Sequence, residues 1–177
     1  MVELGFASLI GGLLAFAYGA GAALYGGVRR DRRWVDSARR SVYAAAVLLT
    51  VCVVVLEAAF LRSDFSVELV ADHSSTTTPT FYKVTAMWGS QGGSLLLWAW
   101  ILSLASSGAL FVTRNRHREV VPWATAVLCG LGVFFAALML LAGGANPFAR
   151  LNPVPAEGIG LNPRLRHPAM ALHPPML

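Results

Sequence analysis

Residues 4–28 read LGFASLIGGLLAFAYGAGAALYGGV and contain no charged side chain. An α-helix needs roughly 20 apolar residues to cross the hydrocarbon core of a bilayer, which is about 30 Å thick. This stretch is long enough, and it ends directly in a cluster of arginines that begins at Arg29. We therefore predict a transmembrane helix from Leu4 to Val28, and this helix sets the class of fold.

Three further apolar runs follow the first one along the chain. They cover Ser41–Leu61, Ser94–Thr113 and Pro122–Ala142, and Glu57 is their only charged residue. The chain of 177 residues is 56% hydrophobic and 13% charged, whereas a typical soluble domain is about 25% charged. A soluble domain of this size could not bury so much apolar surface, and the apolar residues fall into four long blocks. A soluble enzyme, a disordered tail and a disulfide scaffold are therefore disfavoured. We predict an all-α membrane protein with a four-helix transmembrane region over residues 1–142.

The basic residues are unevenly distributed between the two sides that four spans create. The short loop 29–40 holds six arginines and two aspartates, and the short loop 114–118 holds three arginines. The opposite side is longer but poorer in basic residues. Short cytoplasmic loops carry the excess of Lys and Arg. We therefore predict both termini outside, with an outer loop at 62–93 and a Pro/Gly-rich outer segment at 143–177.

The charge pattern also indicates what the chain contacts. Its formal net charge is +5, but the basic residues lie at the borders of the spans and form no basic face interleaved with aromatic residues. The lipid bilayer is therefore the predicted partner and nucleic acid is not. Glu3 is the only early charge, so the first span is expected to be retained rather than cleaved as a signal peptide. Cys52 and Cys129 fall inside spans and are predicted to be small buried residues.

Glu57 lies one turn from the outer end of the second span. A carboxylate near the membrane interface costs much less than one at the bilayer centre. A role in a proton relay or in ligand binding is one interpretation. The simpler interpretation, which we favour, is a carboxylate that reaches lipid headgroups or pairs with Arg62 or Lys83.

Small residues recur every four positions in the first span, at Gly11, Ala15, Gly19 and Ala23. This spacing places them on one helix face, where they allow a neighbouring helix to approach closely. The stripe fits either packing within the chain or a dimerisation surface, and we favour packing within the chain.

The outer loop changes character along its length. Between Ser63 and Asp72 the apolar residues Phe65, Val67 and Leu69 alternate with polar ones, which predicts a short strand or extended segment. The Ser/Thr/Pro-rich residues 74–79 are predicted to form a loop, and we expect His73 beside them to be solvated.

Aromatic residues flank a Gly/Ser cluster just before the third span, with Trp88 and Gly89 at its start and Trp98 inside the span. Tryptophans at the water boundary are typical of an interfacial aromatic belt. Glycines beside a tryptophan can also form a surface where a flat, apolar ligand approaches the backbone. Both interpretations stay open on composition alone.

The outer segment 143–177 is rich in proline and glycine, and its Asn-Pro pairs favour turns. Such a segment holds its shape only when it packs on another part of the chain. His167 and His173 are six residues apart, which is not a helical ligand spacing, and two ligands alone do not form a zinc site. His173 lies in an apolar segment before two prolines and is the candidate axial ligand of a metal or haem. An interfacial histidine hydrogen-bonded to backbone is the other interpretation.

Three segments together match the pattern of a known family. They are Asp64–Val67 with Phe81–Lys83, the tryptophan-rich stretch Trp88–Trp98, and Gly160–Pro163 with His173–Leu177. On these residues the chain resembles the N-terminal part of the CcmF family, the large membrane subunits of the cytochrome c maturation haem lyase. The topology of that family agrees with the orientation predicted from the arginines.

The resemblance implies a function at the outer face of the bacterial inner (plasma) membrane. There the family receives haem from a haem chaperone and helps attach it to the Cys-x-x-Cys-His motif of apocytochrome c, together with thiol-handling partners. The resemblance implies that His173 is one axial ligand of a haem b iron, with the second ligand outside this chain. Trp88, Gly89 and Trp98 would be part of the haem or partner surface. In such a site the protein controls the orientation and redox state of the haem.

Family members are several times longer and carry a tryptophan-rich haem-binding motif and a partner histidine further along. We therefore expect this chain to be an N-terminal portion in which 143–177 leads to a missing next span, and to be inactive alone as a haem lyase. A close paralogue dedicated to cytochrome c nitrite reductase is one alternative. A non-catalytic membrane scaffold that docks partner subunits is another. A transporter is disfavoured, because the spans carry no paired charges or broken helices.

Overall fold

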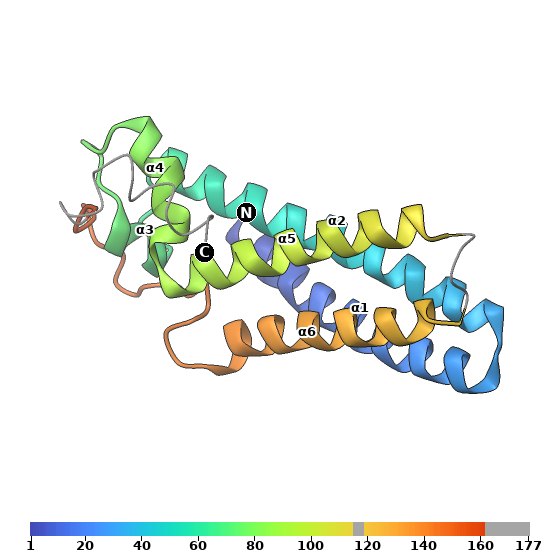
Figure 1. Ribbon diagram of the computed structural model, residues 1–177. Coiled ribbons are helices and arrows are strands. Elements are labelled where there is room, and N and C mark those ends of the chain that lie inside the picture. The colour runs from blue at the N-terminus through green and yellow to red at the C-terminus, as the bar shows by residue number, and fades with distance from the viewer. Residues whose placement is uncertain (115–118, 162–177) are drawn as a thin grey trace. The chain divides into compact units, whose positions relative to one another are not determined.

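The computed structural model describes residues 1–114 and 119–161, and most of this range is helical (Figure 1). The four long helices are α1 (Val2–Arg29), α2 (Arg32–Arg62), α5 (Gln91–Val112) and α6 (Val121–Leu141). Between α2 and α5 lie the short helices α3 (Glu68–His73) and α4 (Thr80–Ala86) and the 3₁₀ turn η1 (Met87–Gly89). Each long helix is long and apolar enough to cross a membrane. The predicted all-α membrane fold with four spans is confirmed.

One of the four helices extends well beyond its apolar run. α2 begins at Arg32, whereas the apolar run begins at Ser41. The charged first turns are held together by Asp36, whose carboxylate lies 2.9 Å from Arg39 Nη1 and 3.6 Å from Arg32 Nε. A helix continues past the hydrocarbon when its side chains reach polar surroundings and pair with one another. The apolar run therefore locates the part of α2 that fits inside a membrane, but it does not predict the residue at which the helix begins.

The chain divides into two compact units, and each is described separately. Unit 1 comprises Met1–Phe6, Cys52–Leu97 and the described part of Met139–Leu177. Unit 2 comprises Ala7–Val51 and Trp98–Leu138. All four long helices contribute residues to both units.

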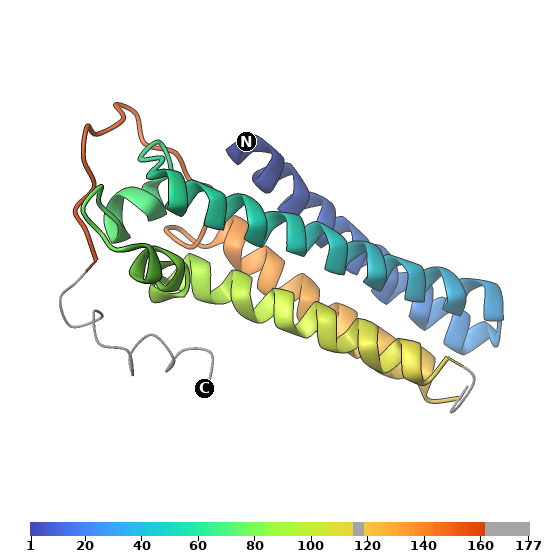
Figure 2. The same cartoon turned by 90° about the horizontal axis from the view of Figure 1, so that it is seen from above.

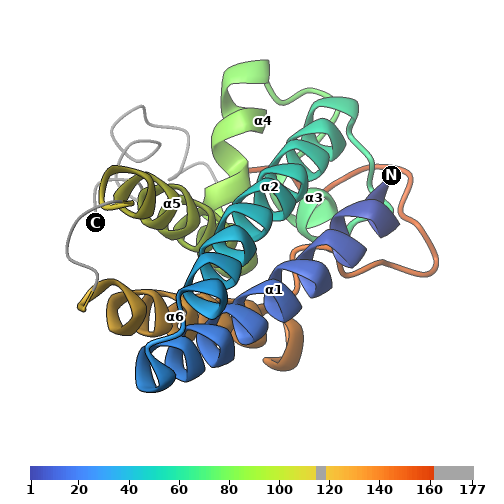
Figure 3. The same cartoon turned by 90° about the vertical axis from the view of Figure 1, so that its right-hand side faces the viewer.

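In unit 2, α1 packs against α2 and α6 through its small residues (Figure 3). Gly19 is buried, and a Cβ placed on it would overlap with Ser41 Oγ of α2 and lie 2.8 Å from Cys129 Sγ of α6. A Cβ on Gly11 would lie 3.2 Å from a methyl group of Leu48 in α2. The small-residue stripe therefore serves packing within the chain, as predicted.

Polar contacts between helices are few in the described residues. In unit 2 the indole N–H of Trp100 donates to Thr50 Oγ1 at 2.9 Å, which connects α5 to α2. Figure 2 shows the ribbons of these two helices running beside each other. In unit 1 the thiol of Cys52 donates to the Gly5 carbonyl at 3.3 Å. Both Cys52 and Cys129 are buried and free, so the prediction that they are small buried residues is confirmed.

The predicted strand between Ser63 and Asp72 is largely wrong. Its beginning forms turns, and only Val67 is extended, where it makes an isolated antiparallel bridge with Arg150. From Glu68 onward the chain forms α3, which buries Leu69, Val70 and Ala71. The bridge offers a pairing partner to very few residues, so the following backbone groups satisfy their hydrogen bonds within a helix instead.

Candidate functional site

The turn from η1 into α5 contains two of the predicted site residues, Trp88 and Gly89. Ser90 caps α5, because its Oγ accepts a hydrogen bond from the backbone N–H of Gly93 at 3.1 Å. The hydroxyl of Ser94 donates to the Trp88 carbonyl at 2.6 Å. Two serine side chains therefore fix the direction in which this turn enters the helix.

Two glycines in the first turn of α5 are buried against the protein's own backbone. A Cβ on Gly93 would overlap with the carbonyl oxygen of Met87, and a Cβ on Gly92 would lie 2.7 Å from the carbonyl oxygen of Ala145. These contacts fill the space next to both glycines, so Gly92 and Gly93 serve close packing. Gly89, in contrast, is exposed.

The predicted site residues do not all fall in one described unit. Trp88 is half-buried and lies beside exposed Gly89 in unit 1. Trp98 belongs to unit 2, and 37% of it is exposed. His173, the predicted axial ligand, lies outside the described residues, as does His167.

A polar pocket of about 250 Å³ opens beside Gly89 in unit 1. Its lining includes Asp72 and His73 from α3 and Gln91 from α5. His73 is half-buried rather than fully solvated as expected, and its Nδ1 lies 3.1 Å from the Leu69 carbonyl oxygen. The tautomer that donates to this carbonyl leaves Nε2 as an acceptor. The pocket thus combines carboxylates with one imidazole.

The pocket beside Gly89 does not by itself fit a haem. The pocket beside Gly89 is smaller than the roughly 300–1,000 Å³ cavities that hold small organic ligands, and His73 is its only imidazole. Within residues 1–114 and 119–161, no three His, Cys, Asp or Glu side chains are grouped so that they could hold a metal ion. No chemical step on haem is therefore assigned to these residues.

The segment that follows α6 is fixed to the loop that follows α2. Backbone N–H groups donate from Glu68 to Ala149 O at 2.9 Å and from Leu151 to Ser66 O at 3.0 Å. Further on, the N–H of Ile159 donates to Ala71 O at 2.7 Å. The expectation that this Pro/Gly-rich segment holds its shape by packing is confirmed as far as Leu161.

Two close contacts at glycines strengthen this attachment. The ring of Phe148 fills the space in which a Cβ on Gly5 would lie, so the segment also packs on the start of α1. Gly158 approaches the Ser74 carbonyl oxygen so closely that any side chain would collide with it. Glycine is required at that position because the two backbones touch.

Glu157 adds a side-chain connection to the same loop. Its carboxylate accepts hydrogen bonds from the Thr76 N–H at 2.8 Å and from the Thr76 hydroxyl at 2.7 Å. The bond from the Thr76 hydroxyl and then that from its backbone N–H lower the pKa of Glu157 below its ordinary value of 4.5. The charged form is therefore the one that holds the loop.

We expect acid to loosen this connection. A carboxyl group whose pKa is lowered on folding stabilises the fold above its unfolded pKa, and this contribution is lost as the pH falls through the lowered folded value. Hydrogen-exchange protection factors of the Ile159 and Gly160 amides should fall between about pH 6 and about pH 3. Glu157→Gln should remove this pH dependence, whereas Glu68→Gln, at an exposed carboxylate of the same unit, should keep it. An unchanged pH profile in Glu157→Gln would contradict the assignment.

The predicted pairing of Glu57 with Arg62 or Lys83 is wrong. Lys83 Nζ donates to Ser63 Oγ at 2.7 Å, and Arg62 Nη1 lies 2.8 Å from Met1 Sδ. Oε2 of Glu57 is buried, with no hydrogen-bond partner among the described residues. Lys83 and Arg62 thus contact other residues near the end of α2, and neither forms an ion pair with Glu57.

Comparisons with known proteins agree with this architecture. No family model matches the chain. It is 36% identical over 176 residues to the cytochrome c-type biogenesis protein CcmF of Pseudomonas aeruginosa, covering 99% of this chain and 26% of that protein. It is 40% identical over 157 residues to the probable cytochrome c-type biogenesis protein NrfE of Escherichia coli, covering 86% of this chain and 28% of that protein. The solved structure of "Cytochrome c Heme Lyase CcmF" matches with a TM-score of 0.82 and 30% identity over 99% of this chain and 27% of that one.

The four spans and these similarities define the class, a multi-pass membrane protein similar to the cytochrome c-type biogenesis proteins. More particularly, the chain is a homologue of the CcmF-type proteins, and the family resemblance inferred from the sequence is confirmed. The chain spans about a quarter of the length of the curated relatives it matches.

Proposed function

We propose that the chain is the N-terminal portion of a CcmF-type haem lyase that handles haem during cytochrome c assembly. The observation that carries the proposal is the similarity of nearly the whole chain to the CcmF protein of Pseudomonas aeruginosa and to the haem lyase structure. In the proposed role the chain accepts haem from a haem chaperone and helps deliver it to apocytochrome c with thiol-handling partners. The haem lyase activity belongs to the longer protein, and this portion alone is inactive.

The proposed orientation places unit 1 at the outer, periplasmic face of the bacterial inner membrane. The support is the excess of arginine in residues 29–40 and 114–118, which lie between the apolar runs and favour the cytoplasm. The attached segment 145–161 and the turn at Trp88 and Gly89 belong to unit 1. This arrangement would bring the chain that leads to His173 to the same face as the turn.

We propose His173 as one axial ligand of the haem b iron, with the second ligand supplied from outside this chain. When bound, the haem supplies the vinyl groups that become attached to apocytochrome c. A neutral imidazole is a common haem ligand, whereas the described residues offer only His73 in a small pocket. Trp88, Gly89 and Trp98 are proposed as part of the haem or partner surface.

The test is a haem titration of the purified chain followed by visible absorption. We expect weak binding with a spectrum typical of a single imidazole ligand, and His173→Ala should lose that spectrum. His167→Ala, six residues away in the same segment, is the matched control and should bind haem as the original chain does. Equal spectra in the original chain and in His173→Ala would refute the ligand assignment. Absence of haem from all three proteins, with normal capture of partner subunits, would favour a scaffold without haem chemistry.

A second candidate is the paralogue that serves cytochrome c nitrite reductase. The observation in its favour is the 40% identity to an NrfE protein. The two candidates differ in the apocytochrome that they serve. Crosslinking of the chain to the apo form of a mono-haem cytochrome c or to that of a nitrite reductase therefore distinguishes them.

A further inference from the structure

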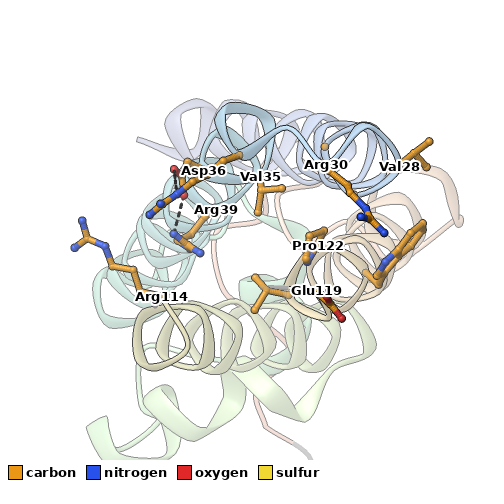
Figure 4. A pocket seen from close by; sticks show the side chains of 13 residues that line it. Val28, Arg30, Val35, Asp36, Arg39, Arg114, Glu119 and Pro122 are labelled. Atoms are coloured by element: carbon orange, nitrogen blue, oxygen red, sulfur yellow. Dashed lines mark hydrogen bonds and ion pairs between the residues drawn. The ribbon is translucent and has the colours of Figure 1, made fainter. Parts of the chain in front are cut away.

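A second and larger pocket lies in unit 2, remote in sequence from the residues proposed for haem (Figure 4). Its volume is about 640 Å³, within the range of pockets that hold small organic ligands. It is formed where α1 ends, α2 begins, α5 ends and α6 begins. Among the described residues its lining includes four arginines and two acidic residues, which are Arg30, Arg32, Arg39, Arg114, Asp36 and Glu119. Four positive and two negative charges give these described lining residues a net charge of +2.

Arg39 is the residue that most needs a further partner. Only 12% of its side chain is exposed, and one of its guanidinium nitrogens donates to Asp36 Oδ1 at 2.9 Å. Its Nε is buried without any hydrogen-bond partner. A buried donor without an acceptor is costly, and each such case requires an explanation such as a bound ion or ligand.

Asp36 positions the arginines but does not neutralise the pocket. Its second carboxylate oxygen lies 3.6 Å from Arg32 Nε, so both oxygens are engaged by arginines of α2. Figure 4 shows Arg30, on the turn between α1 and α2, across the opening from Arg39 and Asp36 of α2. Arginines from separate elements thus border one space, and they lack enough carboxylates to pair with. An anion with several acceptor oxygens would satisfy them.

The surroundings of the arginines indicate the source of such an anion. Val35, Val121 and Pro122 provide apolar lining, and Trp123 lines the pocket with 48% of its surface exposed. The pocket opens at the charged ends of helices that are long and apolar enough to span a membrane. Tryptophan is enriched at the headgroup level of bilayers, and basic pockets between transmembrane helices bind anionic headgroups.

We infer that this pocket binds the phosphate of an anionic phospholipid headgroup, with the buried guanidinium of Arg39 as its central donor. The headgroup phosphate supplies acceptor oxygens to Arg39 and Arg30, and the acyl chains leave along the apolar surface near Trp123. Arginine is suited to this role because its planar fork donates to phosphate through two parallel hydrogen bonds. If the arginines served only to orient the protein in the membrane, none of them would need to be buried.

The test uses the purified chain in a nonionic detergent, titrated with short-chain phosphatidylglycerol and followed by tryptophan fluorescence. We expect saturable binding, and little binding of phosphatidylcholine of the same chain length, because its headgroup has no net charge. Arg39→Gln should raise the Kd for phosphatidylglycerol about tenfold through the loss of a charged hydrogen-bond donor. Arg40→Gln changes the same charge at the next position, exposed and outside the pocket lining, and should change the Kd by less than about twofold.

A second variant keeps the test informative if Arg39→Gln does not fold. Arg30 is exposed, and Arg30→Gln should raise the Kd several-fold without disturbing the core. Equal effects of Arg39→Gln and Arg40→Gln would overturn the inference, as would equal affinity for phosphatidylcholine. Displacement of the lipid by inorganic phosphate at the same concentration would identify a free phosphate as the ligand and overturn the lipid assignment.

Discussion

Gly93→Ala is expected to destabilise unit 1 by about 2–3 kcal/mol, although it adds one methyl group. The new Cβ would overlap with the carbonyl oxygen of Met87, which belongs to η1 and cannot rotate away as a flexible side chain can. Either η1 or the first turn of α5 has to shift. Because Ser94 and Ser90 connect that turn to Trp88 and to the helix start, the shift should also move the proposed haem or partner surface.

Gly108→Ala is the matched control for this change. Gly108 lies in the same helix, and nothing lies within 4 Å of the position that its Cβ would take. Alanine is favoured over glycine in a helix interior by roughly 1 kcal/mol, so this variant should be as stable as the original chain or more so. The measurement is thermal unfolding followed with a thiol-reactive fluorogenic dye, which reports exposure of the buried Cys52 and Cys129. Equal midpoints for the two variants would mean that the contact between Gly93 and Met87 is not needed.

Gly19→Leu should destabilise unit 2 by about 3 kcal/mol or more, because overpacking forces neighbouring elements apart. The added side chain would meet Ser41 of α2 and Cys129 of α6 at once, with the Ala38 carbonyl oxygen 3.7 Å from its Cβ. If α1 moved away from α2 alone, the leucine would press harder on α6, so α1 has to move away from both helices. Cys129 should then react with the dye at a lower temperature than in the original chain.

Gly21→Leu provides the comparison on the same helix. Gly21 is exposed and has nothing within 4 Å of its Cβ position, so a leucine there faces the surroundings of the helix. We expect an unfolding midpoint close to that of the original chain. If Gly19→Leu also left the midpoint unchanged, the assignment of the small-residue stripe to packing within the chain would be wrong.

Much of the fold was predictable because, in a bilayer, the local sequence alone determines where a spanning helix forms. A backbone in hydrocarbon must satisfy its hydrogen bonds within its own segment, so run length and charge alone locate each span. The helix α6 begins within one residue of the predicted Pro122. The prediction was wrong for the start of α2, because the charged residues before Ser41 were taken to lie outside the helix. Asp36 pairs with Arg32 and Arg39, each about one turn away, and these ion pairs support the helix as far back as Arg32.

The outer loop was harder to predict, because contacts between distant residues shape it. The alternation of Phe65, Val67 and Leu69 predicts a strand, but a strand needs a partner along its whole length. Only Val67 finds one, at Arg150, more than eighty positions away. Likewise, nothing near Thr76 in the sequence indicates that Glu157 accepts its hydrogen bonds.

For the candidate site, sequence reasoning singled out Trp88, Gly89 and Trp98 as part of a haem or partner surface, which stays a prediction, and treated the arginines only as topology signals. Counts of arginine predicted orientation and gave no reason to single out any one of them. Burial of Arg39 with an unpaired Nε is a property of the packed helix ends. The partial signal in the sequence was Asp36, an acidic residue three positions before Arg39 and four after Arg32.

The sequence by itself determined that the chain has four helices long and apolar enough to cross a membrane, and that it resembles the CcmF family. It could do so because apolar length, charge at span borders and a family motif are all local properties of the chain. Only the tertiary structure decided that backbone atoms fill the space beside Gly92 and Gly93, that neither Arg62 nor Lys83 pairs with Glu57, and that Arg39 is largely buried. Each of these depends on which atoms of distant segments come within a few ångströms of one another, and local sequence pattern does not encode those distances.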